Sequence, residues 1–336
     1  MFATRRLQNL YQEREVPLTR RLVVTDHAFK NLDHEQAAAA ATGASFEAFQ
    51  CVSEEETASA VRGADAVITN FAPITEAVLS NMNQGGAVIR YGIGYDNVDI
   101  DAATRLGIAV ANVPDYGISA VADHAAASIL ALLRQLPTYT DMIRTKGWAK
   151  PGDVGQLPAL SSLTVGFVGY GRIARALRDR LEPFGFSFIA FDPLVAGGDL
   201  TESDPKMLDL DELARRSHVI SLHAPSTPET VGIIDRAFLA KLPTGSIVVN
   251  TARGQLVDLE ALAEALHTGH LRGAALDVTN PEPLPGDSPL RKMSNVLLSP
   301  HAAFYDEESL DRLQQLASDE AERALRGQPL SNVVNG

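Results

Sequence analysis

The chain has 336 residues, of which 45% are hydrophobic and 21% are charged, as in an ordinary globular protein. Its 42 acidic and 29 basic residues give a formal net charge of −13, which would repel a nucleic-acid backbone and argues against nucleic-acid binding. No apolar run in the sequence approaches the roughly 20 residues that span a bilayer, so we expect no membrane insertion. A chain of this length favours two domains over a single core.

The segment 1–22 has several arginines but lacks the apolar stretch of a secretory signal. A transit peptide is one interpretation of this segment, against which Glu13 and Glu15 argue, and we expect a solvated tail instead. Cys51 is the only cysteine, so no internal disulfide can form and we expect a reducing compartment, the cytoplasm. Because the sequence ends at Gly336, we expect no appended regulatory domain.

Short apolar runs alternate with helical patterns in the first part of the chain. The apolar runs predict strands at 21–26, 65–70, 86–91 and 107–112, with an edge strand at 45–53 that contains Cys51. Helical spacing predicts helices between these strands, at 34–43 and 99–107.

Residues 119–148 keep helical spacing, with many alanines, until Pro137, where we expect a kink or a break. Small residues allow another helix to approach closely, so this region either packs within its own subunit or forms a domain or subunit interface. Both interpretations stay open from the sequence. Residues 149–162 predict a turn-rich connector.

A second series of strands and helices follows the connector. Its strands are predicted at 163–169, 187–192, 218–223, 245–250, 273–278 and 295–300. Its helices are predicted at 172–181, 210–216 and 259–269. Alternation of strands and helices is typical of parallel sheets with helices on both faces, so the sequence predicts an α/β fold with two sheets.

The stretch Gly169-Tyr170-Gly171-Arg172-Ile173-Ala174 matches the pattern G-x-G-x-x-G/A between a predicted strand and a predicted helix. In that position Gly169 allows a tight turn, and Gly171 lets a pyrophosphate lie against the N-terminus of the helix. Asp192 ends the next predicted strand, about 20 residues on, where a carboxylate accepts hydrogen bonds from a ribose. No arginine follows it in FDPLVAGG, so NAD is favoured over NADP. A glycine turn without a ligand is the alternative.

A second glycine-rich stretch, YGIGYDN at 91–97, also follows a predicted strand, but it has no such helix register and no acidic partner at ribose distance. Successive backbone N–H groups in such a loop can form a nest for a carboxylate. Taken alone, the stretch fits a plain turn better than a binding loop.

Three further motifs lie at the carboxyl ends of predicted strands, where open α/β sheets bind ligands. They are NTARGQLVD at 250–258, ALDVTNPEPLP at 275–285 and LLSPHAAFYDEES at 297–309. Together with the glycine fingerprint they resemble the D-isomer-specific 2-hydroxyacid dehydrogenase family over residues 22–335. The wording of YGIGYDNVDI, GIAVANVP and SPHAAFYDEES is most similar to the branches of the C-terminal binding proteins and the phosphoglycerate dehydrogenases.

The resemblance implies two Rossmann-like domains with parallel sheets, in which the nucleotide domain is inserted in a discontinuous, flavodoxin-like substrate domain. It implies a substrate domain of residues 1–111 and 304–336 and an NAD-binding domain of residues 112–303. It also implies that the YGIGYDN loop binds the substrate carboxylate through the backbone amides of Ile93 and Gly94. It further implies a cleft between the two domains, whose closure would exclude water from the reaction.

The residue types of the three motifs suit reduction of a 2-oxo acid or oxidation of a D-2-hydroxy acid. Histidine titrates near neutrality, so His301 suits the transfer of the proton to or from the hydroxyl. Glu282 would hydrogen-bond its imidazole and favour the protonated form. Arg253 offers a planar, permanently charged fork that can bind the carboxylate and polarise the carbonyl. For each residue alone a structural contact is the better interpretation, but three such positions beside a dinucleotide fingerprint favour catalysis.

The resemblance implies a larger set of residues around the cofactor, which is expected to be NAD. We expect His223 beside the nicotinamide and Asp277 at its carboxamide. The whole implied set is Val121, Gly169, Gly171, Arg172, Ile173, Asp192, Pro193, His223, Ala224, Pro225, Thr230, Thr251, Ala252, Asp277, His301 and Ala303. No metal site is expected, because His267 and His270 have no thiolate or carboxylate cluster beside them.

Two positions depart from the related branches. Phe304 stands where C-terminal binding proteins carry tryptophan, which alters the width of the pocket. The segment 69–75 lacks the arginine that phosphoglycerate dehydrogenases use for phosphate, and Lys30 is the only nearby replacement that we can name. These departures favour a substrate without a phosphate.

The function expected from the sequence is therefore an NAD-dependent D-2-hydroxyacid dehydrogenase acting as a homodimer on a small acid. A phosphoglycerate dehydrogenase and an NAD-responsive, corepressor-like binding protein are the alternatives. Formate dehydrogenase chemistry is disfavoured, because that branch pairs its histidine with glutamine and this chain has Glu282.

Overall fold

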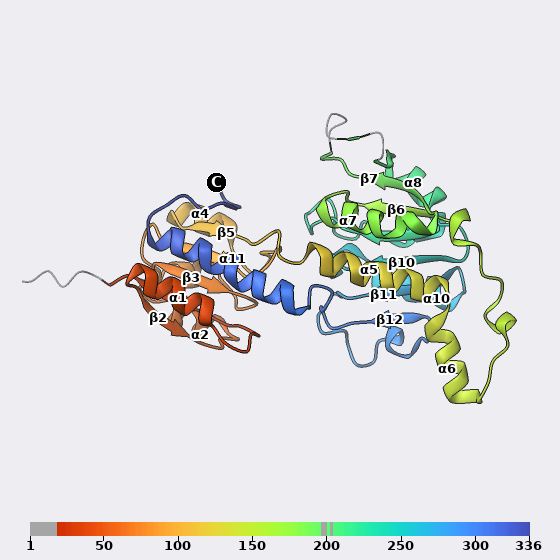
Figure 1. Ribbon diagram of the computed structural model, residues 1–336, viewed down its shortest axis with the longest axis horizontal. Helices are drawn as coiled ribbons and strands as arrows, with labels where there is room; N and C mark the ends of the chain where they lie inside the picture. The colour runs from red at the N-terminus through yellow and green to blue at the C-terminus, as the bar shows by residue number, and fades with distance from the viewer. Residues whose placement is uncertain (1–18, 196–199, 202–203) are drawn as a thin grey trace, which may run out of the picture. The chain divides into compact units, whose positions relative to one another are not determined.

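The computed structural model describes residues 19–195, 200–201 and 204–336, so the expected N-terminal tail lies outside the described residues (Figure 1). The described chain divides into two compact units. Unit 1 contains the described residues up to Tyr116 together with Glu307–Gly336, and unit 2 contains Gly117–Asp306. We describe each unit by itself.

Unit 1 is built on a five-stranded sheet in the order β2-β1-β3-β4-β5. Its strands, all parallel, are β1 (Arg21–Val24), β2 (Ser45–Ala48), β3 (Ala66–Thr69), β4 (Ala87–Arg90) and β5 (Ala109–Ala111). Its helices are α1 (Asp33–Thr42), α2 (Glu54–Ala60), α3 (Glu76–Leu79), α4 (Ile100–Leu106) and α11 (Glu307–Leu325). Because successive side chains of a strand point to opposite faces, Leu22 packs with α1 and α11, whereas Val23 packs with α2, α3 and α4.

Unit 2 is built on a seven-stranded sheet in the order β12-β11-β10-β9-β6-β7-β8. Its strands, all parallel, are β6 (Thr164–Val168), β7 (Ser187–Phe191), β8 (Lys206–Met207), β9 (Val219–Leu222), β10 (Ser246–Asn250), β11 (Leu271–Leu276) and β12 (Val296–Leu298). The strand order reverses at β6, which pairs with both β7 and β9. Ligands bind outside the carboxyl ends of the strands at such a switch point.

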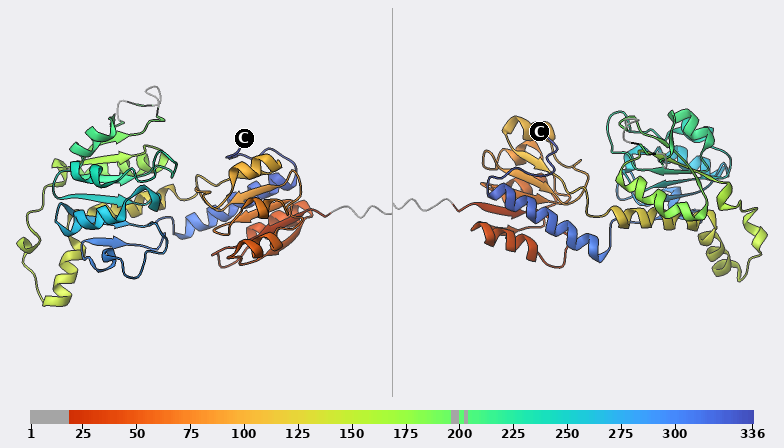
Figure 2. Two further views of the ribbon diagram at one scale, coloured as in Figure 1. Left: turned by 180° about the vertical axis from the view of Figure 1, so that it is seen from behind. Right: turned by 45° about the horizontal axis from the view of Figure 1, so that its top comes forward.

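Helices cover both faces of the unit 2 sheet (Figure 2). On one face lie α5 (Ile118–Leu133) and α7 (Arg172–Leu181), and on the other lie α8 (Leu210–Arg216), α9 (Arg236–Lys241) and α10 (Leu259–His267). The predicted α/β fold with two parallel sheets is therefore confirmed.

Two details differ from the sequence-based prediction. The predicted edge strand ends at Ala48, so Cys51 lies beyond β2 in a buried position instead of in a strand. The predicted helical region is broken at Gln135, which has a φ of 55°, before α6 (Leu136–Lys146) begins. Pro137 lies in the first turn of α6, where its missing N–H costs no hydrogen bond, so the break precedes the proline.

The two helices of this region differ in their burial. α5 buries Ala122, Ala125, Ile129 and Leu132 in the core of unit 2, which is packing within the subunit. α6 buries no residue, and it projects from the rest of unit 2 (Figure 1). Among the described helices, none is long and apolar enough to cross a membrane.

Candidate active site

The glycine fingerprint joins β6 to α7, as the sequence predicts. Gly169 has a φ of 87°, and a Cβ built on it would lie 2.8 Å from the backbone N of Ala224. Only glycine therefore suits this turn, which brings the loop after β9 against the fingerprint. A Cβ on Gly171 would meet nothing within 4 Å, and this residue caps α7 without a side-chain hydrogen bond. The space beside Gly171 is therefore open at the start of α7, where a phosphate would suit the N-terminus of the helix.

Asp192 follows β7 and is held beside the fingerprint by backbone donors. Its Oδ2 accepts from the N–H of Tyr170 at 2.8 Å, and its Oδ1 accepts from the N–H of Leu194 at 2.9 Å. A carboxylate oxygen accepts two hydrogen bonds, so each oxygen retains a place for another donor. This orientation fits a ribose hydroxyl pair. Pro193 is exposed next to it.

The loop after β9 carries the next group of predicted residues. His223 Nε2 lies 2.8 Å from Ser221 Oγ, and burial lowers the pKa of His223 to about 3, so its ring is neutral at pH 7. The hydroxyl of Thr230 donates to the carbonyl of Pro225 at 2.6 Å and accepts from the N–H of Thr227 at 2.8 Å. Thr230 therefore closes the turn that carries Pro225.

The loop after β10 carries Arg253 on a turn that Asn250 holds from inside. Asn250 is fully buried, and its side chain donates to the carbonyl of Arg253 at 2.8 Å and accepts from the N–H of Ala252 at 3.0 Å. Arg253 Nη1 donates to the carbonyl of Ala252 at 2.7 Å. Thr251 Oγ1 is buried and, within the described residues, has no hydrogen-bond partner. A buried hydroxyl is expected to have a partner, so a polar group of a ligand fits here.

Gly254 brings the loop after β10 into contact with the loop after β11. A Cβ built on Gly254 would lie 2.1 Å from the carbonyl carbon of Thr279 and 2.7 Å from the backbone N of Asn280. Since Glu282 follows on the second of these loops, this close approach brings the loops of Arg253 and Glu282 together at one edge of the sheet.

His301 lies on a turn after β12 that is anchored to Asp277. Its φ of 53° is uncommon for a non-glycine residue and indicates a conformation that the surrounding structure imposes. The N–H of His301 donates to the carbonyl of Asp277 at 2.8 Å, and the N–H groups of Ala302 and Ala303 donate to its carboxylate at 2.8 and 2.9 Å.

The imidazole of His301 contacts the predicted carboxylate. His301 Nδ1 lies 3.1 Å from Glu282 Oε1, and the two side chains are 29% and 44% exposed. Because a carboxylate only accepts, Nδ1 carries the hydrogen in this contact. The ring of Phe304 stands edge-on to the imidazole, with 6.3 Å between the centroids.

The remaining predicted residues lie on helices of unit 2 or in unit 1. Val121 is buried on α5, and Arg172 and Ile173 begin α7. In unit 1, the side chain of Asn112 donates to the carbonyl of Ile93 at 2.7 Å, and among the described residues no acceptor is found for the N–H groups of Ile93 and Gly94. Sequence reasoning missed Asn250, Ser299 and His124, which position other residues of the site.

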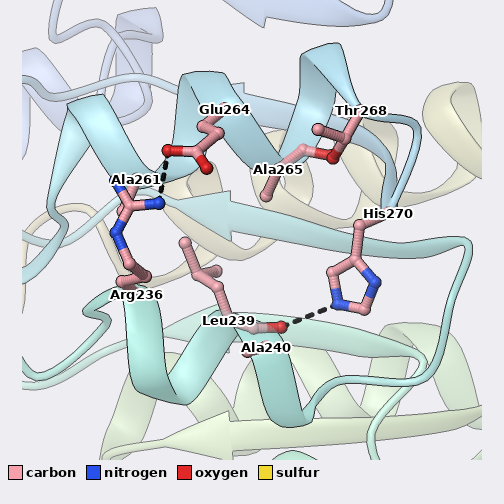
Figure 3. A pocket seen from close by; sticks show the side chains of 8 residues that line it. All are labelled: Arg236, Leu239, Ala240, Ala261, Glu264, Ala265, Thr268 and His270. Carbon is pink, nitrogen blue, oxygen red and sulfur yellow. Dashed lines mark hydrogen bonds and ion pairs between the residues drawn. The ribbon is translucent and has the colours of Figure 1, made fainter.

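No group of three or more histidine, cysteine, aspartate or glutamate residues in the described ranges could hold a metal ion. A shallow cavity of about 240 Å³ lies elsewhere in unit 2, between α9 and α10 (Figure 3). Its wall is mostly apolar, with an ion pair of Arg236 and Glu264 and a hydrogen bond from His270 Nε2 to the carbonyl of Leu239 at 2.9 Å. It contains none of the predicted site residues.

The chain is similar to known proteins over most of its length. Residues 126–303 match the family described as D-isomer specific 2-hydroxyacid dehydrogenase, NAD binding domain. The chain is 40% identical to a D-3-phosphoglycerate dehydrogenase of Mycobacterium tuberculosis over 82% of its length and 52% of that protein. It is 34% identical to a hydroxypyruvate reductase of Blautia hydrogenotrophica over 84% of its length and 88% of that protein.

A solved structure covers almost the whole fold. D-lactate dehydrogenase of Aquifex aeolicus, in complex with NAD and lactic acid, has a TM-score of 0.83 and 27% identity over 94% of this chain and 99% of that one. The chain spans about half the length of the curated phosphoglycerate dehydrogenases that it matches. NAD is the cofactor of the matched domain, and the open helix start, the oriented Asp192 and the unpartnered Thr251 hydroxyl fit it. The chain belongs to the D-isomer-specific 2-hydroxyacid dehydrogenase family, and unit 2 carries its NAD-binding domain.

Proposed function

We propose that this chain is an NAD-dependent dehydrogenase that interconverts a small D-2-hydroxy acid and its 2-oxo acid. The observation that carries the proposal is the contact of 3.1 Å between His301 Nδ1 and Glu282 Oε1. The backbone contact at Gly254 brings the loops of Glu282 and Arg253 together at the same edge, where the fold binds its dinucleotide. An acid, its charged neighbour and a carboxylate-binding cation are the parts that this reaction requires.

In the reductive direction, bound NADH supplies the hydride that reduces the carbonyl carbon. His301 then gives its Nε2 proton to the new alkoxide, while Glu282 stabilises the imidazolium through Nδ1. Arg253 binds the substrate carboxylate and polarises its carbonyl. In the oxidative direction His301 acts as the base and takes the proton of the hydroxyl.

We propose the backbone N–H groups of Ile93 and Gly94 as further donors to the substrate carboxylate. They have no acceptor among the described residues, as a loop that binds an anion requires. The carbonyl of Ile93 is fixed by Asn112, so the loop keeps its shape without a ligand.

We propose a substrate without a phosphate, such as glyoxylate, hydroxypyruvate or pyruvate. The choice rests on the absence of an arginine from the segment 69–75 itself, although the guanidinium of Arg90 lies 5.7 Å from the ring of Phe71 in that segment. Phosphoglycerate is the second candidate, which the 40% identity to phosphoglycerate dehydrogenases favours.

We also propose that the enzyme acts as a homodimer in the cytoplasm. α6 buries no residue of its own subunit and exposes Leu136 and Ile143, and Trp148 after it is 76% exposed. Apolar side chains gathered on one exposed helix are typical of a subunit interface. The single cysteine suits a reducing compartment.

The test is the oxidation of NADH with a panel of 2-oxo acids that includes 3-phosphohydroxypyruvate. We expect turnover of the small acids and a fall of at least about 100-fold in kcat for His301→Ala, since general acid catalysis contributes about 10²–10⁴-fold. His267→Gln, at the exposed end of α10, is the matched control and keeps the activity. Absence of turnover with every acid would contradict the proposal, and NADH-dependent capture of a protein partner would then favour the binding protein.

A further inference from the structure

Asp277 is linked to helix α5 by two side chains that the proposed reaction does not use. Ser299 Oγ donates to Asp277 Oδ1 at 2.5 Å, and His124 Nε2 lies 3.1 Å from the same Oγ. His124 is separated from Ser299 by 175 positions and comes from α5, whose neighbouring residues Ala125 and Ser128 are buried. All three groups belong to unit 2.

The direction of the hydrogen bonds from His124 through Ser299 to Asp277 follows from which groups can donate. The Asp277 carboxylate only accepts, and it is 4% exposed. The single proton of the Ser299 hydroxyl therefore goes to Asp277, and its oxygen must accept from His124. His124 thus carries a hydrogen on Nε2, in either of its charge states.

The count of acceptor positions shows how these hydrogen bonds orient the Asp277 carboxylate. Oδ1 accepts from Ser299 Oγ and from the N–H of Ala302, which uses both of its lone pairs. Within the part of the chain that the structure describes, Oδ2 accepts only from the N–H of Ala303, which leaves one position. A carboxamide of a nicotinamide can donate to this position. The carboxylate is thereby held in one orientation, with its free position on a single oxygen.

The same orientation supports the turn of His301. The N–H groups of Ala302 and Ala303 follow directly on His301, whose φ of 53° persists only while its surroundings impose it. If the Ser299 bond is lost, Oδ1 regains an unfilled position in a buried site, and the carboxylate can rotate to fill it. Rotation would release the two N–H groups and move the free position of Oδ2.

We propose that His124 and Ser299 are positioning residues that, acting through Asp277, hold both the nicotinamide-binding oxygen and the turn of His301. The part that concerns His301 rests on the proposed function. The part that concerns the nicotinamide requires only that the protein binds NAD. It predicts that removing either group weakens the contact with the nicotinamide end of the cofactor and leaves the adenosine end unchanged.

The test compares the dissociation constants of NADH and of ADP-ribose, which lacks the nicotinamide. In Ser299→Ala and His124→Leu we expect NADH to bind about 10-fold or more weakly, as loss of a hydrogen bond to a charged group implies. ADP-ribose should bind as it does to the wild type. Ser299→Thr and His124→Gln retain a hydroxyl and an N–H donor, so both should recover most of the NADH affinity. His267→Gln is the matched histidine control.

A double variant separates positioning from general damage to the fold. His124→Leu should cost little in the Ser299→Ala background, because the two groups act in one chain. Equal weakening of NADH and ADP-ribose, or additive losses in the double variant, would overturn the proposal. So would Ser299→Ala with wild-type NADH affinity.

Activity is a second and separate readout. If the wild type turns over a 2-oxo acid, Ser299→Ala should lower kcat and raise the primary isotope effect with 4-deuterated NADH, because misplacement of His301 slows the chemical step. If the wild type turns over none of the acids, the proposed function fails, and the NADH and ADP-ribose comparison still decides on His124 and Ser299.

Discussion

Replacement of Gly171 by alanine tests whether the loop after β6 binds the pyrophosphate of NAD. A Cβ on Gly171 would meet no atom within 4 Å, and its φ of −86° suits any residue. The substitution removes some freedom of the unfolded chain, which stabilises by about 0.4–1 kcal/mol, and puts a poor N-cap residue on α7, which costs a similar amount. The free energy of unfolding should therefore change by less than about 1 kcal/mol, a shift in Tm of a few degrees at most.

The effect on the cofactor should be much larger. A phosphate oxygen must come to about 2.7–3.2 Å from a backbone N–H to accept a hydrogen bond. The added methyl group stands on that approach, so the phosphate retreats and loses at least one charge-assisted bond, worth about 1.5–3 kcal/mol. We therefore expect the Kd of NADH to rise about 10- to 150-fold.

Gly169→Ala is the contrasting variant, because the cost there lies in the fold. At a φ of 87° an alanine is conformationally strained, and its Cβ would lie only 2.8 Å from the backbone N of Ala224. We expect the two effects together to lower the free energy of unfolding by about 2–4 kcal/mol. Urea unfolding measures stability, and NADH fluorescence titration measures binding. Wild-type NADH affinity in Gly171→Ala would refute the assignment of this loop to the phosphates. Wild-type stability in Gly169→Ala would refute the packing described for the turn.

Two further predictions follow from the same structure. Gly254→Ala forces a Cβ to within 2.1 Å of the Thr279 backbone, so the loops of Arg253 and Glu282 should separate and kcat/KM should fall more than 10-fold. Gly286→Ala, with open space around it, is the control and should retain the activity. Equal activities of the two variants would contradict the proposed contact. The pKa of His223 is lowered from 6.5 to about 3, so below pH 6.5 the unfolded chain binds a proton that the folded protein excludes, and stability falls by about 1.4 kcal/mol per pH unit. Urea unfolding at pH 7 and pH 5.5 should show this loss in the wild type and a smaller loss in His223→Gln, and identical pH dependence in both would refute the burial of a neutral imidazole.

Much of the fold could be predicted because its local patterns agree with its tertiary structure. The strand that contains Phe167 is buried from Val165 to Val168 and is apolar over that stretch, and the fingerprint after it has a left-handed turn at Gly169 that favours glycine. The break at Gln135 could not be predicted in the same way. Pro137 is compatible with the first turn of a helix as well as with a kink, and only the left-handed backbone of Gln135 decides between them.

The sequence pattern predicts which edge of the sheet carries the candidate catalytic residues, but not which residues hold them. Arg253, Glu282 and His301 lie on the loops after β10, β11 and β12, and the topology of a parallel sheet brings these loops to one edge. In the sequence, Asn250 is only the polar last residue of a predicted strand. The structure shows that its side-chain amide donates to the carbonyl of Arg253 and accepts from the N–H of Ala252, which holds the turn.

Asp277 shows the same limit most clearly. The sequence motif assigns it to the carboxamide of the cofactor, yet three of its four acceptor positions are used by Ser299, Ala302 and Ala303. The hydroxyl of Ser299 also contacts His124, which lies 175 positions away on a helix whose pattern indicates only an apolar face. A motif can therefore identify the group that meets the ligand, but the number and direction of its remaining hydrogen bonds belong to the folded structure. On the proposal made above, the orientation of the Asp277 carboxylate depends on His124 and Ser299 as well as on the motif itself.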